Sequence, residues 1–333
     1  MESIDQGRRN VLLGAAALGA GGWAVPAAAA ADAFPQRPIR FVVPFNAGGS
    51  TDVMARGLAE AMSKHLGQPI VVENRTGASG MLGTDHVAKS APDGYTVAVS
   101  LSTSLLINQF LYNKMSYNPL KDLLMLSQLV KAGTVLVVHP SVPANTMQEL
   151  LAWVKANSGK LSYGSWGVGS YAHLAGAYMS NSQKADMNHI AYKGEAPMLQ
   201  ELIGGQLQLC FAGAQGTKPF IDAGRLKAIG VTGRERMEVL PQLATIYEQG
   251  VTDDAYQLTG WVGMAVPAKT PQPVVDKLYA ALQKVSQEKK VTDMLRATGF
   301  QAYFSNPQEF AKSYRAEMPV WQHLVDEAGA RVD

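Results

Sequence analysis

The chain has 333 residues, of which 47% are hydrophobic and 17% are charged, and its formal net charge is +2. This composition is typical of a well-packed globular protein and excludes an intrinsically disordered chain. The weak charge, without a run of Lys and Arg, also argues against binding to nucleic acid, and the length is enough for two lobes of ordinary size.

Residues 1–33 have the pattern of a cleaved export signal. Arg8 and Arg9 precede a short apolar stretch at 11–25, and an alanine tract follows it. Twin arginines before a weakly hydrophobic segment favour the Tat route of a bacterium, with Sec export as the alternative. Small residues predict cleavage near Ala33, and a membrane anchor is the competing interpretation. We therefore expect a periplasmic protein.

Strands and helices alternate along the first part of the mature chain. An apolar run at 39–45 predicts a buried strand, and apolar side chains at four-residue spacing predict a helix over 53–66. Segments 69–74 and 94–102 predict two further strands, with a helix over 80–91 between them. Short turns between alternating strands and helices indicate parallel βαβ units, and hence an α/β sheet.

The same order occurs again in the second half. Residues 160–180 predict a strand, a Gly/Ser turn and a helix, and the alternation continues through 189–213 and 225–233. From residue 270 onward the chain is helical and amphipathic, with Trp321 in the last helix. We expect this C-terminal part to pack on the first lobe.

Two extended runs, at 134–140 and 260–267, are candidates for strands that cross between the lobes. They divide the chain into two α/β lobes. We predict lobe 1 at 34–133 and 262–333, and lobe 2 at 134–261.

Cys210 is the only cysteine, so an internal disulfide and a multi-cysteine metal site are excluded. It lies in an alternating, strand-like run, where a lone cysteine is most often a small buried hydrophobic residue. The six histidines show no spacing typical of zinc ligands. We predict neither a metal nor a cofactor.

Two glycine-rich turns, each after a predicted strand and before a predicted helix, are candidate anion sites. Helix N-termini carry unpaired N–H groups and a partial positive charge, and α/β folds bind ligands at the carboxyl ends of their strands. The alternative is two ordinary turns, and we expect Asp52 to cap its helix. The candidate residues are Asn46, Ala47, Gly48, Gly49, Ser50 and Thr51 in the first turn and Ser165, Gly167, Gly169 and Ser170 in the second.

The sequence patterns that would indicate catalysis are weaker than those that indicate an anion site. Residues 167–172 fit the G-x-G-x-x-G/A dinucleotide fingerprint, but the acidic residue expected at the end of the next strand is missing. Residues 77–81 miss the nucleophile elbow by its last glycine. His173 and His189 are expected to be hydrogen-bonded structural histidines rather than bases. We predict no enzyme; an exported dinucleotide-dependent oxidoreductase or hydrolase and a ligand-free interaction or sensor module remain the alternatives.

Five linked motifs carry a family resemblance over nearly the whole mature chain. They are PIRFVVPFNAGGSTDVMAR, VVENRTGASGMLGTDHVAKSAPDGYT, LSYGSWGVGSYAHLA, HIAYKGEAPMLQELIGGQL and WVGMAVPAKTP. In this order and spacing the chain resembles the periplasmic solute-binding receptors of tripartite tricarboxylate transporters, the Bug or TctC-like family. The resemblance implies a type II periplasmic-binding-protein fold, with a ligand cleft between two lobes that close about a hinge.

The resemblance also implies a ligand and partners. The ligand is a small aromatic or aliphatic carboxylate, held chiefly by backbone N–H groups, hydroxyls and ordered waters. The partners are integral membrane permease subunits, and a monomer is expected. Carried onto this sequence, the site residues are Phe45 to Thr51, Ser102, Thr103, Ser104, and Ser165 to Ser170, together with His173, Tyr192 and Lys193.

The chain departs from the family pattern at several positions. Ala191 stands where the family usually has proline before Tyr-Lys-Gly, Gln208 stands for a usual aspartate, and Ala244 for a usual proline. Trp166 occupies a position where small residues are common. It either stacks on a ring of the ligand, which favours an aromatic carboxylate over citrate or malate, or it packs away from the cleft.

Overall fold

The computed structural model of the chain describes residues 34–332. The predicted export signal at 1–33, with its cleavage site, lies outside the described residues. Within 34–332, no helix has the length and apolar character needed to span a bilayer. The same stretch contains no group of three or more His, Cys, Asp or Glu side chains that could hold a metal ion.

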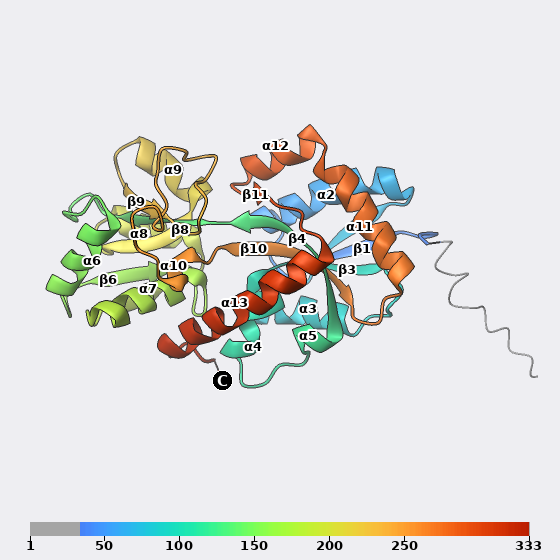
Figure 1. Ribbon diagram of the computed structural model, residues 1–333, viewed down its shortest axis with the longest axis horizontal. Helices are drawn as coiled ribbons and strands as arrows, with labels where there is room; N and C mark the ends of the chain where they lie inside the picture. Colours follow the sequence, from blue (N-terminus) through green and yellow to red (C-terminus); the bar gives the residue numbers. More distant parts are fainter. Residues whose placement is uncertain (1–33, 333) are drawn as a thin grey trace, which may run out of the picture. The chain divides into compact units, whose positions relative to one another are not determined.

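Two β-sheets form the framework of the molecule, and helices cover them (Figure 1). The first sheet has six strands in the order β11-β4-β10-β3-β1-β2, and the second has five in the order β7-β6-β8-β5-β9. The strands of the first sheet are β1 (Ile39–Val43), β2 (Ile70–Asn74), β3 (Thr96–Leu101), β4 (Leu123–Ala132), β10 (Gly260–Pro267) and β11 (Gln301–Ala302). Those of the second are β5 (Thr134–Val138), β6 (Ser162–Ser165), β7 (Asn188–Ala191), β8 (Leu209–Gly213) and β9 (Lys227–Val231).

Both sheets are mixed, whereas the alternation of elements predicted parallel units. The parallel units are present: β1 pairs in parallel with β2 and β3, and β6 pairs in parallel with β7 and β8. However, β10 runs antiparallel to β3 and β4, and β5 runs antiparallel to β8 and β9. Three strands are thus reversed: β5 and β10, each the first strand after the chain passes from one sheet to the other, and β11, which pairs antiparallel to β4.

The chain passes between the sheets twice. Only Gly133 separates β4 from β5, so one extended segment serves both sheets, and the chain returns from β9 to β10 (Figure 1). The two passages are tied together, because the N–H of Thr134 donates to the hydroxyl of Thr232 at 3.0 Å. The two extended runs expected at the crossings are therefore β5 and β10, each the first strand after a passage.

The helices begin and end close to the predicted bounds. The helix expected over 53–66 begins three residues earlier, at Ser50, because the glycine-rich turn itself ends in the first helical residue. The helix expected over 80–91 is shorter, Met81–Ala88. In chain order the helices are α2 (Ser50–Leu66), η1 (Ala78–Gly80), α3 (Met81–Ala88), η2 (Thr103–Ile107), α4 (Asn108–Leu111), α5 (Pro119–Asp122), α6 (Met147–Ala156), α7 (Tyr171–Gln183), α8 (Glu195–Ile203), α9 (Ala214–Asp222), α10 (Asp254–Gln257), α11 (Gln272–Ser286), α12 (Lys289–Ala297) and α13 (Pro307–Glu327).

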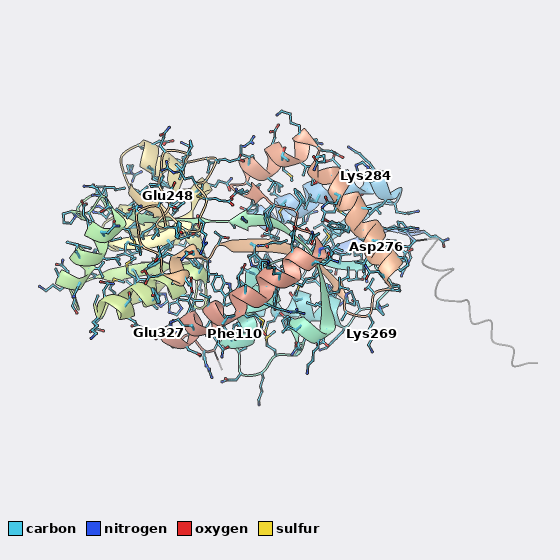
Figure 2. The ribbon with its side chains drawn as sticks, in the orientation of Figure 1. Phe110, Glu248, Lys269, Asp276, Lys284 and Glu327 are labelled. Carbon is cyan, nitrogen blue, oxygen red and sulfur yellow. The ribbon has the colours of Figure 1, made fainter. Side chains whose placement is uncertain are left out.

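The C-terminal helices pack more widely than expected. α11 and α12 lie against α2, which belongs to the first sheet's side of the molecule. The packing of α11 follows its amphipathic pattern, since Leu278 and Leu282 are buried while Asp276 and Lys284 point outward (Figure 2). α13 contacts both β4 and α7, so the last helix packs on the first sheet and on a helix that covers the second sheet. Cys210 is fully buried in β8 with a free thiol, as its alternating pattern predicted.

Candidate ligand-binding site

A cavity of about 610 Å³ lies between elements of the two sheets. Its walls come from the first turn and the end of β3 on one side, from the turn after β6 and from α7, α8 and α9 on the other, and from the crossing segments and the C-terminal region. The lining residues are Ser50, Thr51, Leu101, Ser102, Thr103, Ile107, Ala132, Gly133, Thr134, Trp166, Tyr171, Glu195, Ala196, Leu199, Gln200, Gly213, Ala214, Gln215, Gly216, Phe220, Gly260, Thr298, Gly299, Phe300 and Trp321.

The N-terminus of α2 forms part of the first wall. Ser50 and Thr51 are its first two helical residues, and no hydrogen bond among the described residues takes up their backbone N–H groups. The first N–H groups of a helix have no acceptor within the helix and carry partial positive charge. Gly48 has φ +81°, a conformation that L side chains rarely adopt, so the backbone of this turn favours glycine there.

Asp52 stabilises this turn from inside. Its carboxylate accepts the N–H of Gly48 at 2.8 Å and also binds Arg56 and Asn74. Burial alone would raise the pKa of Asp52, but these hydrogen bonds outweigh it and lower the pKa. The carboxyl therefore stays ionised. The residue at the N-cap position is Gly49, which makes no side-chain cap, so Asp52 satisfies a turn N–H from the third helical position.

The segment after β3 separates its hydroxyls. Ser102 and Thr103 line the cavity, and no side chain or backbone group of the described residues hydrogen-bonds to either hydroxyl. Ser104 is fully buried instead, with its hydroxyl 2.5 Å from that of Ser100 and 2.9 Å from that of Thr84. Three neighbouring hydroxyl residues that the sequence does not distinguish therefore differ in the structure: two line the cavity and one is buried.

Most polar groups of the second glycine-rich turn are hydrogen-bonded within the turn or to the neighbouring histidines. The hydroxyl of Ser165 contacts His189 at 2.7 Å and the carbonyl of Gly167 at 3.1 Å. The hydroxyl of Ser170 accepts the N–H of His173 at 3.4 Å as the N-cap of α7, and the N–H of Gly169 donates to the ring of His173 at 3.1 Å. These groups are engaged within the turn, and the part of it that lines the cavity is Trp166.

His173 and His189 stack with ring centroids 3.8 Å apart. Burial lowers the pKa of His173 to about 4, with a smaller contribution from the neighbouring His189 ring, and burial also lowers the pKa of His189. Both rings are therefore neutral at pH 7, and both hydrogen-bond to the turn. Their geometry fits the structural role expected of them.

Of the residues proposed from the sequence, those that line the cavity are Ser50, Thr51, Ser102, Thr103 and Trp166. The others lie outside its lining: Phe45, Asn46, Ala47, Gly48, Gly49, Ser104, Ser165, Gly167, Gly169, Ser170, His173, Tyr192 and Lys193. Several of these hold the turns from which the lining residues project. A ligand-binding role for each remains a prediction.

Most cavity-lining residues opposite the first turn were not predicted from the sequence. It missed Tyr171, Glu195, Gln215, Phe220, Phe300 and Trp321, which line the cavity from α7, α8, α9, the loop after α12, and α13. Four of these are aromatic, and one is acidic. No local sequence pattern marks these residues as a site, because they come together only when both sheets and the C-terminal region are assembled.

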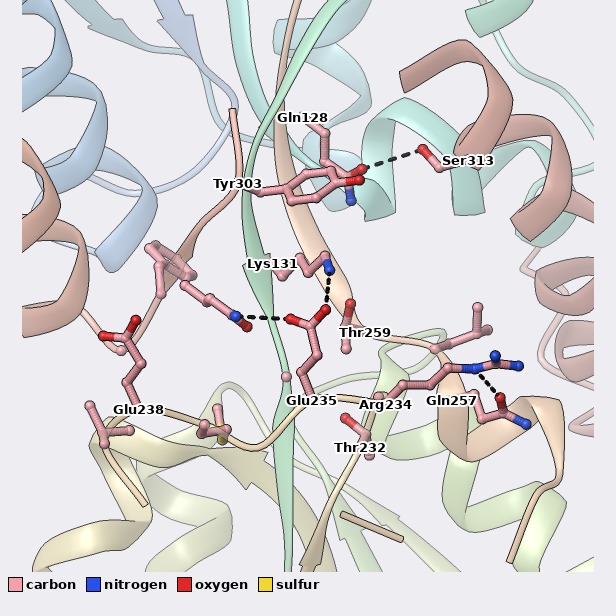
Figure 3. A pocket seen from close by; sticks show the side chains of 18 of the residues that line it. Gln128, Lys131, Thr232, Arg234, Glu235, Glu238, Gln257, Thr259, Tyr303 and Ser313 are labelled. Atoms are coloured by element: carbon pink, nitrogen blue, oxygen red, sulfur yellow. Dashed lines mark hydrogen bonds and ion pairs between the residues drawn. The ribbon is translucent and has the colours of Figure 1, made fainter. Parts of the chain in front are cut away.

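A second cavity, of about 300 Å³, shares Gly133, Gly299 and Phe300 with the first (Figure 3). Two of its acidic side chains are paired: Glu235 lies 3.5 Å from Lys131 and accepts from Gln301 at 3.0 Å, and Glu238 binds Arg296 at 2.7 Å. These pairs join β4, α12 and β11 to the loop after β9. Because its groups satisfy one another, this cavity offers fewer open partners than the larger one.

Two related sequences match this chain over nearly their whole length. A protein from Cupriavidus necator, described as a UPF0065 protein in the gbd 5′ region, is 36% identical over 323 residues, which cover 97% of this chain and 96% of that protein. Protein BugT from Bordetella pertussis is 33% identical over 309 residues, covering 92% of this chain and 94% of that protein.

Solved structures of similar proteins contain small acids. A protein from R. palustris with adipate is 30% identical, with a TM-score of 0.77 and coverage of 90% of this chain and 100% of that one. MatC from Rhodopseudomonas palustris with bound malate is also 30% identical, with a TM-score of 0.73 and coverage of 88% and 100%.

These matches agree with the two-lobed α/β architecture. Residues 54–330 match the model of the tripartite tricarboxylate transporter family receptor. The chain therefore belongs to the tripartite tricarboxylate transporter receptor family, with the two-lobed fold of periplasmic binding proteins.

Proposed function

We propose that this protein is a periplasmic receptor that captures a small carboxylate between its two lobes and delivers it to integral membrane permease subunits. In this proposal, lobe 1 comprises 34–133 and 262–333, lobe 2 comprises 134–261, and the signal at 1–33 is cleaved on export. The protein acts as a monomer and without a cofactor. The periplasmic, adipate-bound and malate-bound relatives support this proposal.

The observation that carries the proposal is the open polar wall of the larger cavity. The unpaired N–H groups of Ser50 and Thr51 at the start of a 17-residue helix lie beside the open hydroxyls of Ser102 and Thr103. A carboxylate has several acceptor sites, and such charge-assisted hydrogen bonds are about twice as strong as neutral ones. A helix N-terminus adds favourable electrostatics for an anion without any basic side chain.

A transport receptor must release its ligand, and the geometry is suited to that. The two walls belong to different lobes, joined through the passages at Gly133 and between β9 and β10. Motion about these passages would separate the hydroxyl wall from the wall formed by α7, α8 and α9 and open the cavity. On the first wall, binding by dipoles and hydroxyls leaves no uncompensated charge when the carboxylate departs.

The competing function is an exported dinucleotide-dependent oxidoreductase or hydrolase built on 167–172. The turn argues against it, because the N–H of Gly169 is bound to His173 and that of Ser170 to the carbonyl of Gly167. A pyrophosphate cradle needs such N–H groups free. Micromolar binding of a nicotinamide cofactor, or turnover of one with a hydroxy-acid substrate, would replace the receptor proposal with this one.

The decisive experiment is a thermal-shift screen of the purified protein against di- and tricarboxylates, amino acids and aromatic acids, followed by calorimetry. A ligand present at about 100 times its Kd stabilises the folded state by about 2.7 kcal/mol. We expect at least one carboxylate to raise the melting temperature with one-to-one stoichiometry. A screen without any binding carboxylate contradicts the proposal and favours a ligand-free interaction or sensor module.

A further inference from the structure

The larger cavity has an uneven charge distribution. Among the described residues that line it, Glu195 has the only acidic side chain, and none has a Lys, Arg or His side chain. The open hydroxyls and the α2 N-terminus lie on the first lobe, whereas Glu195 belongs to α8 of the second lobe. One wall therefore suits an anion and the facing lobe supplies an anion of its own.

The carboxylate of Glu195 is held in place and only half satisfied. One oxygen, Oε2, accepts the N–H of Gly213 at 2.8 Å, just ahead of α9. No described residue donates to Oε1, which comes so close to Gly216 that a Cβ added there would lie 2.3 Å from it. The two glycines let the carboxylate lie flat against the start of α9, with one oxygen left for a ligand.

Such a group discriminates between the ends of a ligand. Burial raises the pKa of Glu195, and the N–H of Gly213 offsets part of this effect. A dicarboxylate whose second carboxylate approached Glu195 would face a like charge in a partly desolvated site. A ligand ammonium would instead supply the missing donor and the missing counter-charge together.

The surroundings of Glu195 in this cavity suit a cation as well. Trp166 and Phe220 come from the same lobe and Phe300 from the C-terminal region, and all three are partly exposed. Aromatic faces attract ammonium groups, most strongly when water is excluded. They also cover the apolar body that joins the two ends of a ligand.

We propose that Glu195 is a specificity-determining residue that binds the ammonium group of an amino-carboxylate, while the carboxylate of the same ligand binds at Ser50, Thr51, Ser102 and Thr103. This inference rests on the proposed receptor function and narrows its ligand class from carboxylates in general to zwitterions with separated charges. It assigns one end of the ligand to each lobe, so that lobe closure brings the two subsites together.

Two pairs of compounds test the inference, because the members of each pair share a carbon skeleton and differ at one end. They are 6-aminohexanoate with adipate, and 4-(aminomethyl)benzoate with terephthalate. Calorimetry at pH 7.5 on the parent protein should show at least tenfold tighter binding of the amino member of a pair than of its diacid. The Glu195→Gln variant keeps an oxygen for Gly213 and loses the charge, so it should lose this preference by at least tenfold.

Glu201→Gln is the matched control, because Glu201 is an exposed carboxylate on the same helix and outside the cavity. It should bind all four compounds as the parent does. A preference for the diacids in the parent, strengthening from pH 7.5 to 5.5 and retained in the uncharged Glu195→Gln variant, would overturn the inference in favour of a protonated Glu195. An unchanged amine preference in Glu195→Gln would also overturn it.

The same measurements separate this inference from the receptor function. If carboxylates from the wider screen bind the parent and Glu195→Gln with equal affinity, and none of the four compounds distinguishes them, the ammonium subsite is wrong and the receptor function stands. If no carboxylate of any kind binds the parent, both are wrong. Circular dichroism and melting curves of each variant establish that the comparison is between folded proteins.

Discussion

The indole N–H of Trp261 donates to a carboxylate oxygen of Glu317 at 2.8 Å. The indole of Trp321, which lines the larger cavity, donates to the same oxygen at 3.3 Å. Trp261 lies on β10, the strand that brings the chain back to the first sheet, and Glu317 lies on α13. One carboxylate thus fixes a crossing strand, the C-terminal helix and part of the cavity wall.

Replacing Glu317 with leucine should therefore be costly. Both tryptophans are fully buried, so the substitution leaves two buried N–H groups without an acceptor, each at about 1–3 kcal/mol. We expect the free energy of unfolding in urea to fall by about 2–4 kcal/mol. Gln322→Leu, at an exposed position of the same helix, is the control and should change it little. Equal stability of the two variants would contradict this account of Glu317.

Gly49→Val tests the carboxylate wall. A Cβ at Gly49 meets only the carbonyl of Asn46, at 3.4 Å, so the fold should tolerate it at about 1 kcal/mol, the cost of a poor N-cap. The side chain would stand beside the N–H of Ser50, and we expect carboxylate binding to weaken at least tenfold by calorimetry. Gly67→Ala, at the other end of α2, should lower stability without changing affinity, because Gly67 has φ +68°. Unchanged binding by Gly49→Val would place the carboxylate elsewhere.

Ser170→Ala distinguishes a cap from a ligand contact. As the N-cap of α7, Ser170 should contribute about 1 kcal/mol to folding stability. If it also binds the carboxylate, the variant should lose a further 1–3 kcal/mol, approximately, in binding. Urea unfolding and calorimetry on the same sample report the two effects separately. A fall in stability with unchanged affinity would assign Ser170 to the cap alone.

Trp166→Ala tests the aromatic side of the cavity. Trp166 is partly buried and packs against both hydrophobic clusters of the molecule while lining the cavity. If it stacks on the ligand, a benzene dicarboxylate should lose about 0.5–1.5 kcal/mol of binding beyond the loss of buried area. Citrate affinity should change little, since citrate has no ring. Tight citrate binding that ignores the substitution, with no response to the aromatic acid, would contradict the predicted preference.

The histidine stack should make the fold sensitive to acid. An unfolded histidine titrates near pH 6.5, whereas burial lowers the pKa of His173 to about 4. Between these values the unfolded chain takes up a proton that the folded protein refuses, so the free energy of unfolding falls as the pH falls. The contribution is present in full above pH 6.5, approximately, and its loss approaches about 3 kcal/mol by pH 4.

His173→Asn is the informative variant for this prediction. Asparagine can still accept the N–H of Gly169 but does not titrate, so urea unfolding between pH 7.5 and 4.5 should show a flatter pH dependence than in the parent. Direct titration of the His173 ring by NMR should give a pKa far below that of a free histidine. An equal pH slope in parent and variant would show that other groups cause the acid sensitivity.

The sequence predicted those features that depend on neighbours along the chain. The strands at 39–43 and 70–74, the helix after the first turn and the buried strand that holds Cys210 follow from local periodicity and turn residues. The mixed character of the sheets did not follow, because the direction of β5 and β10 depends on how the chain travels between sheets. That information is not contained in any short window.

In the candidate site, too, the residues marked by a local pattern were predicted and those that depend on distant contacts were not. Ser50 and Thr51 were found because a glycine-rich turn before a helix is a local pattern. Ser102 and Ser104 could not be told apart, because only the turn of η2 points one to the cavity and the other to Ser100 and Thr84. Glu195 was passed over because a glutamate at the start of a helix is ordinary, and its meaning depends on Gly213 and on a cavity lining without basic side chains.

The two sheets differ in how the chain assembles them, and this has a consequence for the order of folding. All five strands of the second sheet lie within residues 134–231, whereas the first sheet needs β10 and β11, which begin at Gly260 and Gln301. A chain made or exported from its N-terminus must therefore hold β1 to β4 unfinished until most of the protein has emerged. The second sheet can complete its strand pairing first, and the apolar strands before it depend meanwhile on whatever shields them from aggregation.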